Sequence, residues 1–247
     1  MSQPPVPSIQ NIKPPSGWEN DELTKSFDRA RHNQYGTYAN KPMARKLSAI
    51  DAQFAAASKV WLNPQSEIQA MFLLRCHFAF RTAAGLGMAG QACEATVMCR
   101  AMLEFAAYAL HMHRQSPLEM IWLERHTDET ALKKQKKAFQ HVAVLESVKA
   151  ANRHAGKRFE ELYQRTIDFG GHPNERAIIS NMQIIEEPGK RNMMAIMMHG
   201  DGIALDHTLK TVAQCGVNSL EMLQVPFNAR FELLGINHAI LKLRNGF

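Results

Sequence analysis

The sequence contains few cysteines, and none of them is spaced for a metal site or a disulfide framework. Only four occur in 247 residues, and no two of them have the C-x-x-C spacing. Zinc sites and small disulfide-stabilised domains depend on closely spaced cysteines. We therefore expect reduced core side chains in the helices of a cytoplasmic protein at Cys76, Cys93, Cys99 and Cys215.

Long apolar runs are missing as well. No stretch approaches the roughly 20 apolar residues that cross a bilayer, and the start of the chain lacks the basic segment and apolar core of a secretion signal. Neither a membrane-spanning nor a secreted protein is expected. Residues 1–17 contain five prolines instead, which predicts a disordered leader before a single helical domain at residues 18–247.

Motifs that would identify an enzyme are scarce. The sequence has no G-x-S-x-G, no P-loop and no H-E-x-x-H. Residues 85–90 match G-x-G-x-x-G, but the flanking segments are predicted to be helical, whereas a dinucleotide-binding fold requires strands there. We interpret this run as a glycine-rich turn between helices. These absences weaken most enzyme hypotheses, and we predict no cofactor.

A group of histidines and aspartates near residues 172–207 is a candidate metal site. These residue types bind divalent metals, but no pair has the i, i+4 spacing of a helical zinc motif. We therefore predict no metal. His172, Pro173 and Asn174 are more simply interpreted as the end of one helix, with Asn174 capping the next. The group comprises His172, His199, Asp201, Asp206 and His207.

Composition favours helices. The chain has 14 methionines, many alanines and leucines, and only 8% aromatic residues, which disfavours an all-β fold. Residues 91–115 contain no proline or glycine and are apolar around most of their circumference. Such a helix must be covered by other elements on most sides. The sequence therefore predicts a mainly α helical bundle around a central helix at residues 91–115.

The polar residues of that central helix form a narrow stripe. Arg100, Glu104, Tyr108 and His111 are spaced so that they share one face at 100° per residue. An unpaired charge in an apolar core is very costly. The stripe is thus either a set of structural ion pairs or a polar pocket that binds a ligand, with Arg100 for an anion and Glu104 or His111 as acid or base.

The remaining elements follow from periodicity, prolines and caps. Helices are expected at 18–32, 43–62, 64–84, 118–125, 203–224 and 228–243, and a loop at 34–42. A helix interrupted only at Gly156 is expected from Glu129 to Asp168, as a long antiparallel partner for the central helix. Pro188-Gly189 between two apolar runs predicts a small β-hairpin near 182–198.

A basic edge suggests one partner. The net charge is +6, which permits a nucleic-acid partner without requiring one. Lys149, Arg153 and Lys157 are spaced to share one face of the expected long helix, so phosphates could bind along it. The alternative is an ordinary solvated helix face. A nucleotide or nucleic acid is therefore kept as a predicted partner of these three residues.

Arg100-Ala101-Met102-Leu103-Glu104 in the central helix and Gly171-His172-Pro173-Asn174 beyond the next helices give the sequence a resemblance to a known group. Together they resemble bacterial helical proteins related to the HEPN fold, the nucleotide-binding bundles of prokaryotes and higher eukaryotes. Many of those proteins are ribonucleases with an R-x4-H motif, which this sequence lacks. The resemblance therefore implies a bundle over roughly residues 43–243, open to dimerisation, without the family's ribonuclease activity.

Two functions are carried forward. The preferred hypothesis is a non-catalytic cytoplasmic binding or regulatory protein of the HEPN-like kind, which could act as a homodimer. The alternative is a nucleotide- or RNA-directed hydrolase that uses Arg100, Glu104 and His111, with His172 as a further catalytic candidate. In either case, Arg100, Glu104, Tyr108 and His111 are the predicted ligand-binding residues.

Overall fold

The computed structural model describes residues 13–59, 64–115, 117–171 and 173–247 and shows a mainly α protein with a small β-hairpin. Most of the predicted 1–17 leader, and the predicted site residue His172, lie outside the described residues. The helices are α1 (Glu22–Asn40), α2 (Pro42–Ser58), α3 (Glu67–Met88), α4 (Ala92–Arg114), α5 (Leu118–Leu123), α6 (Glu129–Ala138), α7 (His141–Ala151), α8 (Arg153–Thr166), α9 (Glu175–Ile179), α10 (Ile203–Leu223), α11 (Asn228–Leu233) and α12 (Ile236–Leu243).

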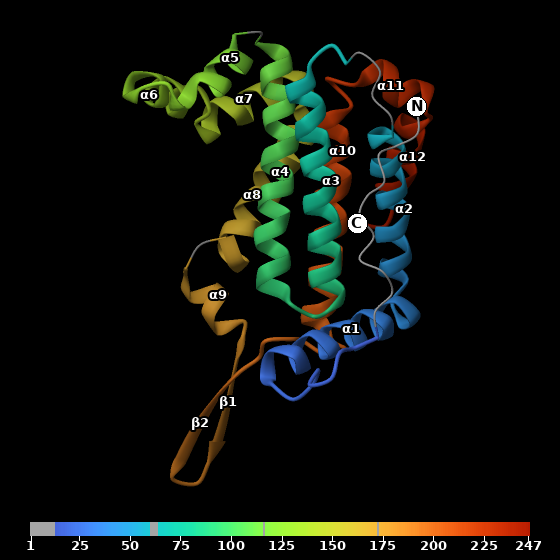
Figure 1. The fold of residues 1–247 in the computed structure, drawn as a ribbon, viewed down its shortest axis with the longest axis vertical. Coiled ribbons are helices and arrows are strands. Elements are labelled where there is room, and N and C mark those ends of the chain that lie inside the picture. The colour runs from blue at the N-terminus through green and yellow to red at the C-terminus, as the bar shows by residue number, and fades with distance from the viewer. Residues whose placement is uncertain (1–12, 60–63, 116, 172) are drawn as a thin grey trace.

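Three long helices form the centre of the bundle. Helix α4 packs against α3 and α10, and α7, α8 and a short π-type segment, η2 (Ile167–Gly171), cover further parts of it. Helices α2 and α12 complete the side next to α10 and α3, whereas α1 crosses one end of the bundle (Figure 1). The predicted central helix at 91–115 is confirmed, because its neighbours surround it as its apolar circumference requires.

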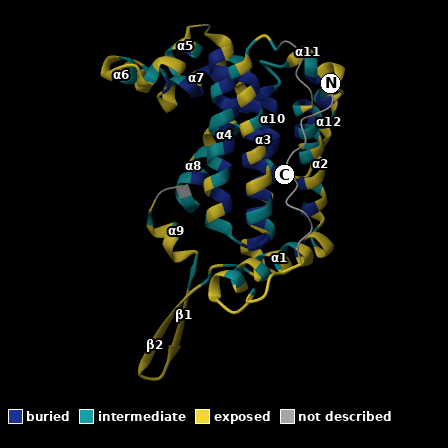
Figure 2. Ribbon diagram, viewed as in Figure 1, coloured by how far each residue is buried: buried dark blue, intermediate teal, exposed yellow. Residues whose placement is uncertain are grey.

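The core is one continuous cluster between these helices. Its largest fully buried side chains include Phe54, Phe80, Phe159 and Phe231, and the buried positions lie along α3, α4 and α10 (Figure 2). Helix α10 approaches its neighbours closely at Gly216, where an added Cβ would lie 2.7 Å from a ring carbon of Phe80. The absence of a side chain there allows α10 to contact α2 and α3 directly.

The predicted loop at 34–42 is wrong, because α1 continues as helix to Asn40. Three polar side chains on this part of α1 bind carbonyl groups at the end of α3. Asn33 donates to the carbonyl of Ala89, Gln34 to that of Gly85 and Thr37 to that of Met88, each over 2.9 Å. Two of these tertiary hydrogen bonds satisfy free carbonyls at a helix C-terminus, those of Met88 and Ala89, whereas the Gly85 carbonyl also accepts from the amide of Ala89. Together they stabilise a helix that local propensity does not favour.

The predicted single helix from Glu129 to Asp168 is also wrong. The chain divides there into α6, α7 and α8, with breaks at Phe139–Gln140 and at Asn152. Asn152 has extended backbone angles, and its side-chain oxygen accepts hydrogen bonds from the amides of His154 and Ala155. An asparagine with this geometry is a helix N-cap, so it starts α8 and changes the direction of the chain.

The hairpin and the glycine run lie at the same end of the bundle. Strands β1 (Met182–Glu187) and β2 (Lys190–Ala195) pair antiparallel, which confirms the predicted hairpin. Gly85 and Gly87 lie inside α3, and only Gly90 forms the turn into α4. Gly90 has φ +85° and lies so close to His199 that an added Cβ would meet its carbonyl oxygen. The positive φ and the close contact with the His199 backbone therefore account for this glycine.

Candidate functional site

Arg100 and Glu104 form a closed cluster with a tyrosine from α8. Arg100 Nε donates to Glu104 Oε1 over 3.0 Å, and Arg100 Nη2 donates to the hydroxyl of Tyr163 over 3.0 Å. That hydroxyl in turn donates to Glu104 Oε1, again over 3.0 Å. The guanidinium also lies over the tyrosine ring, 5.1 Å from its centroid. Both residues of the predicted pair thus form a hydrogen bond with Tyr163 on the neighbouring helix.

The cluster lies at the edge of the core. The Arg100 side chain is 24% exposed and that of Glu104 36%. Burial acts to lower the pKa of Arg100, but Glu104 and Tyr163 outweigh it and hold that pKa above its usual range. Burial and the neighbouring carboxylate both raise the pKa of Tyr163. The electrostatics therefore favour a charged pair and a protonated tyrosine, an arrangement that needs no further ligand.

His111 belongs to a different environment, although it lies on the same stripe. It is 1% exposed; its Nε2 donates to the carbonyl of Ala138 over 3.1 Å, and its Nδ1 accepts from Ser147 over 2.7 Å. Burial lowers its pKa. At 1.5 Å per residue, Arg100 and His111 are about 16 Å apart along the axis. The structure therefore does not bring the three predicted catalytic side chains together.

Tyr108 lies between these two environments. Its ring packs against that of Phe139 at 5.0 Å and that of Phe72 at 6.2 Å, and burial raises its pKa. These contacts are those of an aromatic core residue. The predicted stripe is therefore a real face of α4 that passes from a half-exposed ion pair through an aromatic layer to a buried, hydrogen-bonded histidine.

The predicted basic face is divided between two helices. Lys149 lies in the last turn of α7, whereas Arg153 and Lys157 lie on α8 beyond the break at Asn152, so the expectation of one shared helical face is wrong. Lys149 forms an ion pair with Glu160 over 2.7 Å. Lys157 lies 3.9 Å from Glu161. These carboxylates offset part of the positive charge that phosphate binding would use.

A second polar cluster, which sequence analysis missed, connects α2 with α3. Arg81 donates two hydrogen bonds to the carboxylate of Asp51, over 2.8 and 3.0 Å. His77 Nε2 donates to the same carboxylate over 2.8 Å, and Ser58 Oγ lies 3.3 Å from His77 Nδ1. The serine, histidine and aspartate have the order of a hydrolase triad, but Arg81 shares the carboxylate and the ring of Phe54 stacks on the histidine. We interpret this cluster as a link between the two helices.

A mostly apolar cavity of about 440 Å³ lies at the end of the bundle that carries the hairpin. We call it the base cavity. Small-molecule sites have volumes of roughly 300–1,000 Å³ and mostly apolar walls with a few polar groups. The base cavity is lined by Ala92, Cys93, Thr96, Arg165, Phe169, Ser180, His199, Ile203, Ala204, His207, Thr208 and Thr211.

The polar groups of the base cavity are cationic or neutral, and the described lining residues include no aspartate or glutamate. Arg165 Nη1 donates to Gln214 over 2.7 Å and to Thr211 over 3.4 Å, both neutral side chains. The His207 ring lies 5.7 Å from that of Phe169. Burial lowers the pKa of His207, and the charge of Arg165 adds to this effect. The site therefore offers one positive charge against an apolar wall.

Two helices also begin at this cavity. Ala92 and Cys93 are the first residues of α4, and Ile203 and Ala204 are the first of α10. Neither helix has a side-chain cap at its N-terminus. The first-turn amides and the helix dipole of each favour negative charge. They reinforce the charge of Arg165 rather than oppose it.

The wall next to the hairpin is fixed by a chain of side-chain contacts. Asn181 Nδ2 donates to the sulfur of Cys93 over 2.6 Å, and its Oδ1 accepts from His199 Nε2 over 3.1 Å. The backbone amide of His199 donates to the carbonyl of Gly90 over 2.8 Å. The start of α4 is thus held to the root of the hairpin.

A comparison with protein-family models, curated proteins and solved structures found no match for this chain. In the described part of the chain, no three histidine, cysteine or acidic side chains are grouped so that they could hold a metal ion. No helix among the described residues is long and apolar enough to cross a bilayer.

Proposed function

We propose that this chain is a non-catalytic cytoplasmic binding protein, a helical bundle of the HEPN-like kind, and that it binds a small organic anion in the base cavity. The observation that carries the proposal is a 440 Å³ cavity in which the guanidinium of Arg165 is the one fixed charge among the described lining residues. The ligand class follows from this lining: an apolar body that bears one carboxylate or phosphate group.

Three features support an anion over a neutral ligand. Arg165 is held in place by Gln214 and Thr211, so that its position is fixed while its charge is not neutralised by either partner. The helix termini of α4 and α10 add partial positive charge. The hydroxyls of Thr96 and Thr208 donate to carbonyls one turn earlier in their own helices, which reduces the polar groups available to a neutral, hydrogen-bonding ligand.

The geometry of α4 supports a non-catalytic role. A hydrolase at the stripe would have to open the Arg100, Glu104 and Tyr163 cluster and act about 16 Å from His111. The alternative of a nucleotide- or RNA-directed hydrolase is therefore less well supported. The nucleic-acid partner of Lys149, Arg153 and Lys157 stays a separate prediction; binding there would weaken steeply with added salt.

The proposal is tested by isothermal titration calorimetry with matched pairs of probes. Aliphatic and aromatic carboxylates and phosphate monoesters should bind, and the corresponding neutral amides or alcohols should bind at least tenfold more weakly. Arg165→Gln should reduce the affinity for the anions at least tenfold. Arg45→Gln, at an exposed position of α2 that does not line the cavity, is the control and should bind as the unchanged protein does.

Two outcomes would overturn the proposal. One is an Arg165→Gln variant that is folded by circular dichroism and binds the anions with unchanged affinity. The other is equal binding of the neutral analogues. Ala204→Phe supplies an independent check, because a large side chain at the cavity wall should block every probe whether or not Arg165 is present.

A further inference from the structure

The β-hairpin extends away from the bundle instead of packing on it (Figure 1). All of its residues except Met182 are exposed. Among the described elements, β1 packs against β2 and contacts the short helix α9. A two-stranded hairpin is marginally stable by itself in water. A hairpin of this kind in a folded protein is therefore expected to gain stability from something that covers it.

The strand register gives the hairpin two unequal faces. Residues opposite each other across the pair, and alternate residues along each strand, share a face. One face carries four apolar residues, followed by one charged pair at the tip. We call it the apolar face. It consists of Met182 with Ala195, Ile184 with Met193, and Glu186 with Arg191.

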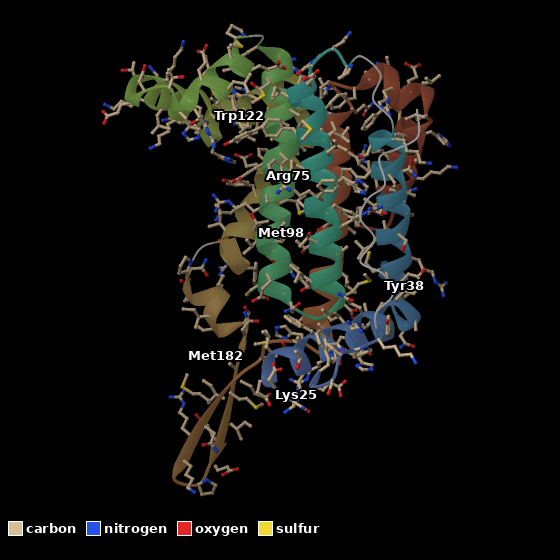
Figure 3. The ribbon with its side chains drawn as sticks, viewed as in Figure 1. Lys25, Tyr38, Arg75, Met98, Trp122 and Met182 are labelled. Atoms are coloured by element: carbon tan, nitrogen blue, oxygen red, sulfur yellow. The ribbon has the colours of Figure 1, made fainter. Side chains whose placement is uncertain are left out.

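The opposite face is more polar. Its apolar residues are Ile185 and Met194, which alternate with Asn192 and Gln183, and the pair at its tip is Glu187 with Lys190. Exposure on the apolar face is high at its centre, 44% for Ile184 and 65% for Met193. The side chain of Met182 marks the root of the hairpin, next to the bundle (Figure 3).

The root of the hairpin is fixed to the bundle. The amide of Ile196 donates to the carbonyl of Asn181 over 2.7 Å, which extends the ladder beyond the strands. Asn181 is itself held by Cys93 and His199. The hairpin is therefore presented in a defined direction, so that a partner can bind it without first ordering its root.

We propose that the apolar face is covered by the same face of a second copy of this chain. When two such hairpins stack about a two-fold axis parallel to their length, each β1 lies over the partner's β2. Ile184 then lies over the partner's Met193, and Glu186 lies over the partner's Arg191. The register makes every contact on this face self-complementary, in both charge and apolar character, as an isologous interface requires.

The tip charges favour a second copy over an unrelated partner. The face has one acidic and one basic residue on different strands, so it has no net charge to attract a partner of either sign. Within one hairpin the Arg191 Nε to Glu186 Oε1 distance is 3.8 Å, long for a hydrogen bond. The two-fold arrangement gives each of these groups a further oppositely charged neighbour. Because one hairpin face is small, we expect a weak, concentration-dependent dimer.

Sedimentation velocity across a range of protein concentrations tests the proposal. The unchanged chain should shift from monomer to dimer as concentration rises, and Ile184→Lys should remain a monomer. Met194→Lys is the matched control, since Met194 is next to Met193 on the same strand and points to the other face; this variant should dimerise normally. A monomer at every concentration, or equal loss in both variants, would overturn the proposal.

A mixing experiment separates contact between copies from stability of the hairpin itself. Glu186→Arg places two basic residues on the face, and Arg191→Glu places two acidic ones, so each variant alone should fail to dimerise. Mixed together, the two variants should form a heterodimer, because each base then lies over an acid. Both variants lack the pair within their own hairpin, so a purely internal role would not be restored by mixing. Failure of the mixture to dimerise would contradict the two-fold arrangement.

Discussion

Replacement of a glutamate by glutamine can be compared at a buried position, Glu221, and at a half-exposed one, Glu104. Glu221 on α10 is 4% exposed, and its carboxylate contacts Arg158 Nη2 over 2.5 Å and Arg244 Nε over 3.4 Å. Glu104 on α4 is 36% exposed and contacts Arg100 and Tyr163. Replacement of each by glutamine removes a charge and keeps the size of the side chain. The expected effects differ because water can reach one position and not the other.

The magnitude follows from the partners left behind. Breaking a buried ion pair costs about 3–5 kcal/mol when the remaining charge stays buried. Arg158 and Arg244 are 33% and 45% exposed, so water offsets part of this loss, and we expect Glu221→Gln to cost about 2–4 kcal/mol. Half-exposed pairs contribute about 0–1 kcal/mol, and Glu104→Gln should fall in that range.

Thermal and urea unfolding, followed by circular dichroism, measure both variants. In a chain of this size 1 kcal/mol corresponds to about 2–4 °C in Tm. Glu221→Gln should therefore lower Tm by roughly 4–16 °C, and Glu104→Gln by less than about 4 °C. The slope of free energy against urea should be unchanged if the folded state is intact. Equal losses, or a larger loss for Glu104→Gln, would refute the assignment of the α4 pair to the edge of the core.

Gly216→Ala should destabilise the protein by about 1–3 kcal/mol, because the added methyl group would lie 2.7 Å from Phe80. Urea unfolding measures this loss. Gly189→Ala has open space around the added methyl group, so it reports the cost of the backbone conformation alone. Burial lowers the pKa of His111, so the folded state favours its neutral form. The stability that depends on this is present above the ordinary histidine pKa of about 6.5 and is lost as pH falls below it. Between pH 7.5 and 5 the unchanged protein should lose more stability than His111→Gln, and parallel pH profiles would contradict this.

The sequence predicts the architecture correctly where a residue pattern is compatible with one structure only. The apolar circumference of residues 91–115 required a covered helix, and Pro188-Gly189 between apolar runs required a turn. It was insufficient where tertiary contacts decided. The continuation of α1 depends on carbonyls of α3 that are 51 to 56 residues away. The break at Asn152 depends on the side chain acting as an N-cap. An asparagine can also occur inside a helix, so the residue alone does not predict the break.

The base cavity was beyond sequence analysis for a related reason. Its lining comes from α4, α8, η2, α10 and two connecting segments, so no spacing along the chain connects Arg165 with Thr96 or His207. The sequence holds a partial signal, because His199 and His207 both follow the hairpin closely. Their proximity in sequence reflected proximity in space, but the chemistry became visible only when Arg165 and the uncapped ends of α4 and α10 were placed beside them.

The polar stripe of α4 shows why a pattern does not by itself define a site. Periodicity places Arg100, Glu104, Tyr108 and His111 on one face, and the structure keeps them there. However, the elements that cover this face change along its length. Tyr163 of α8 contacts Arg100 and aromatic rings pack on Tyr108. Ser147 of α7 and the Ala138 carbonyl form hydrogen bonds with His111. The spacing of residues within one helix determines which side chains share a face. The neighbouring helices determine the dielectric environment of each of those side chains. Four side chains in one line can therefore serve three structural roles without forming a pocket.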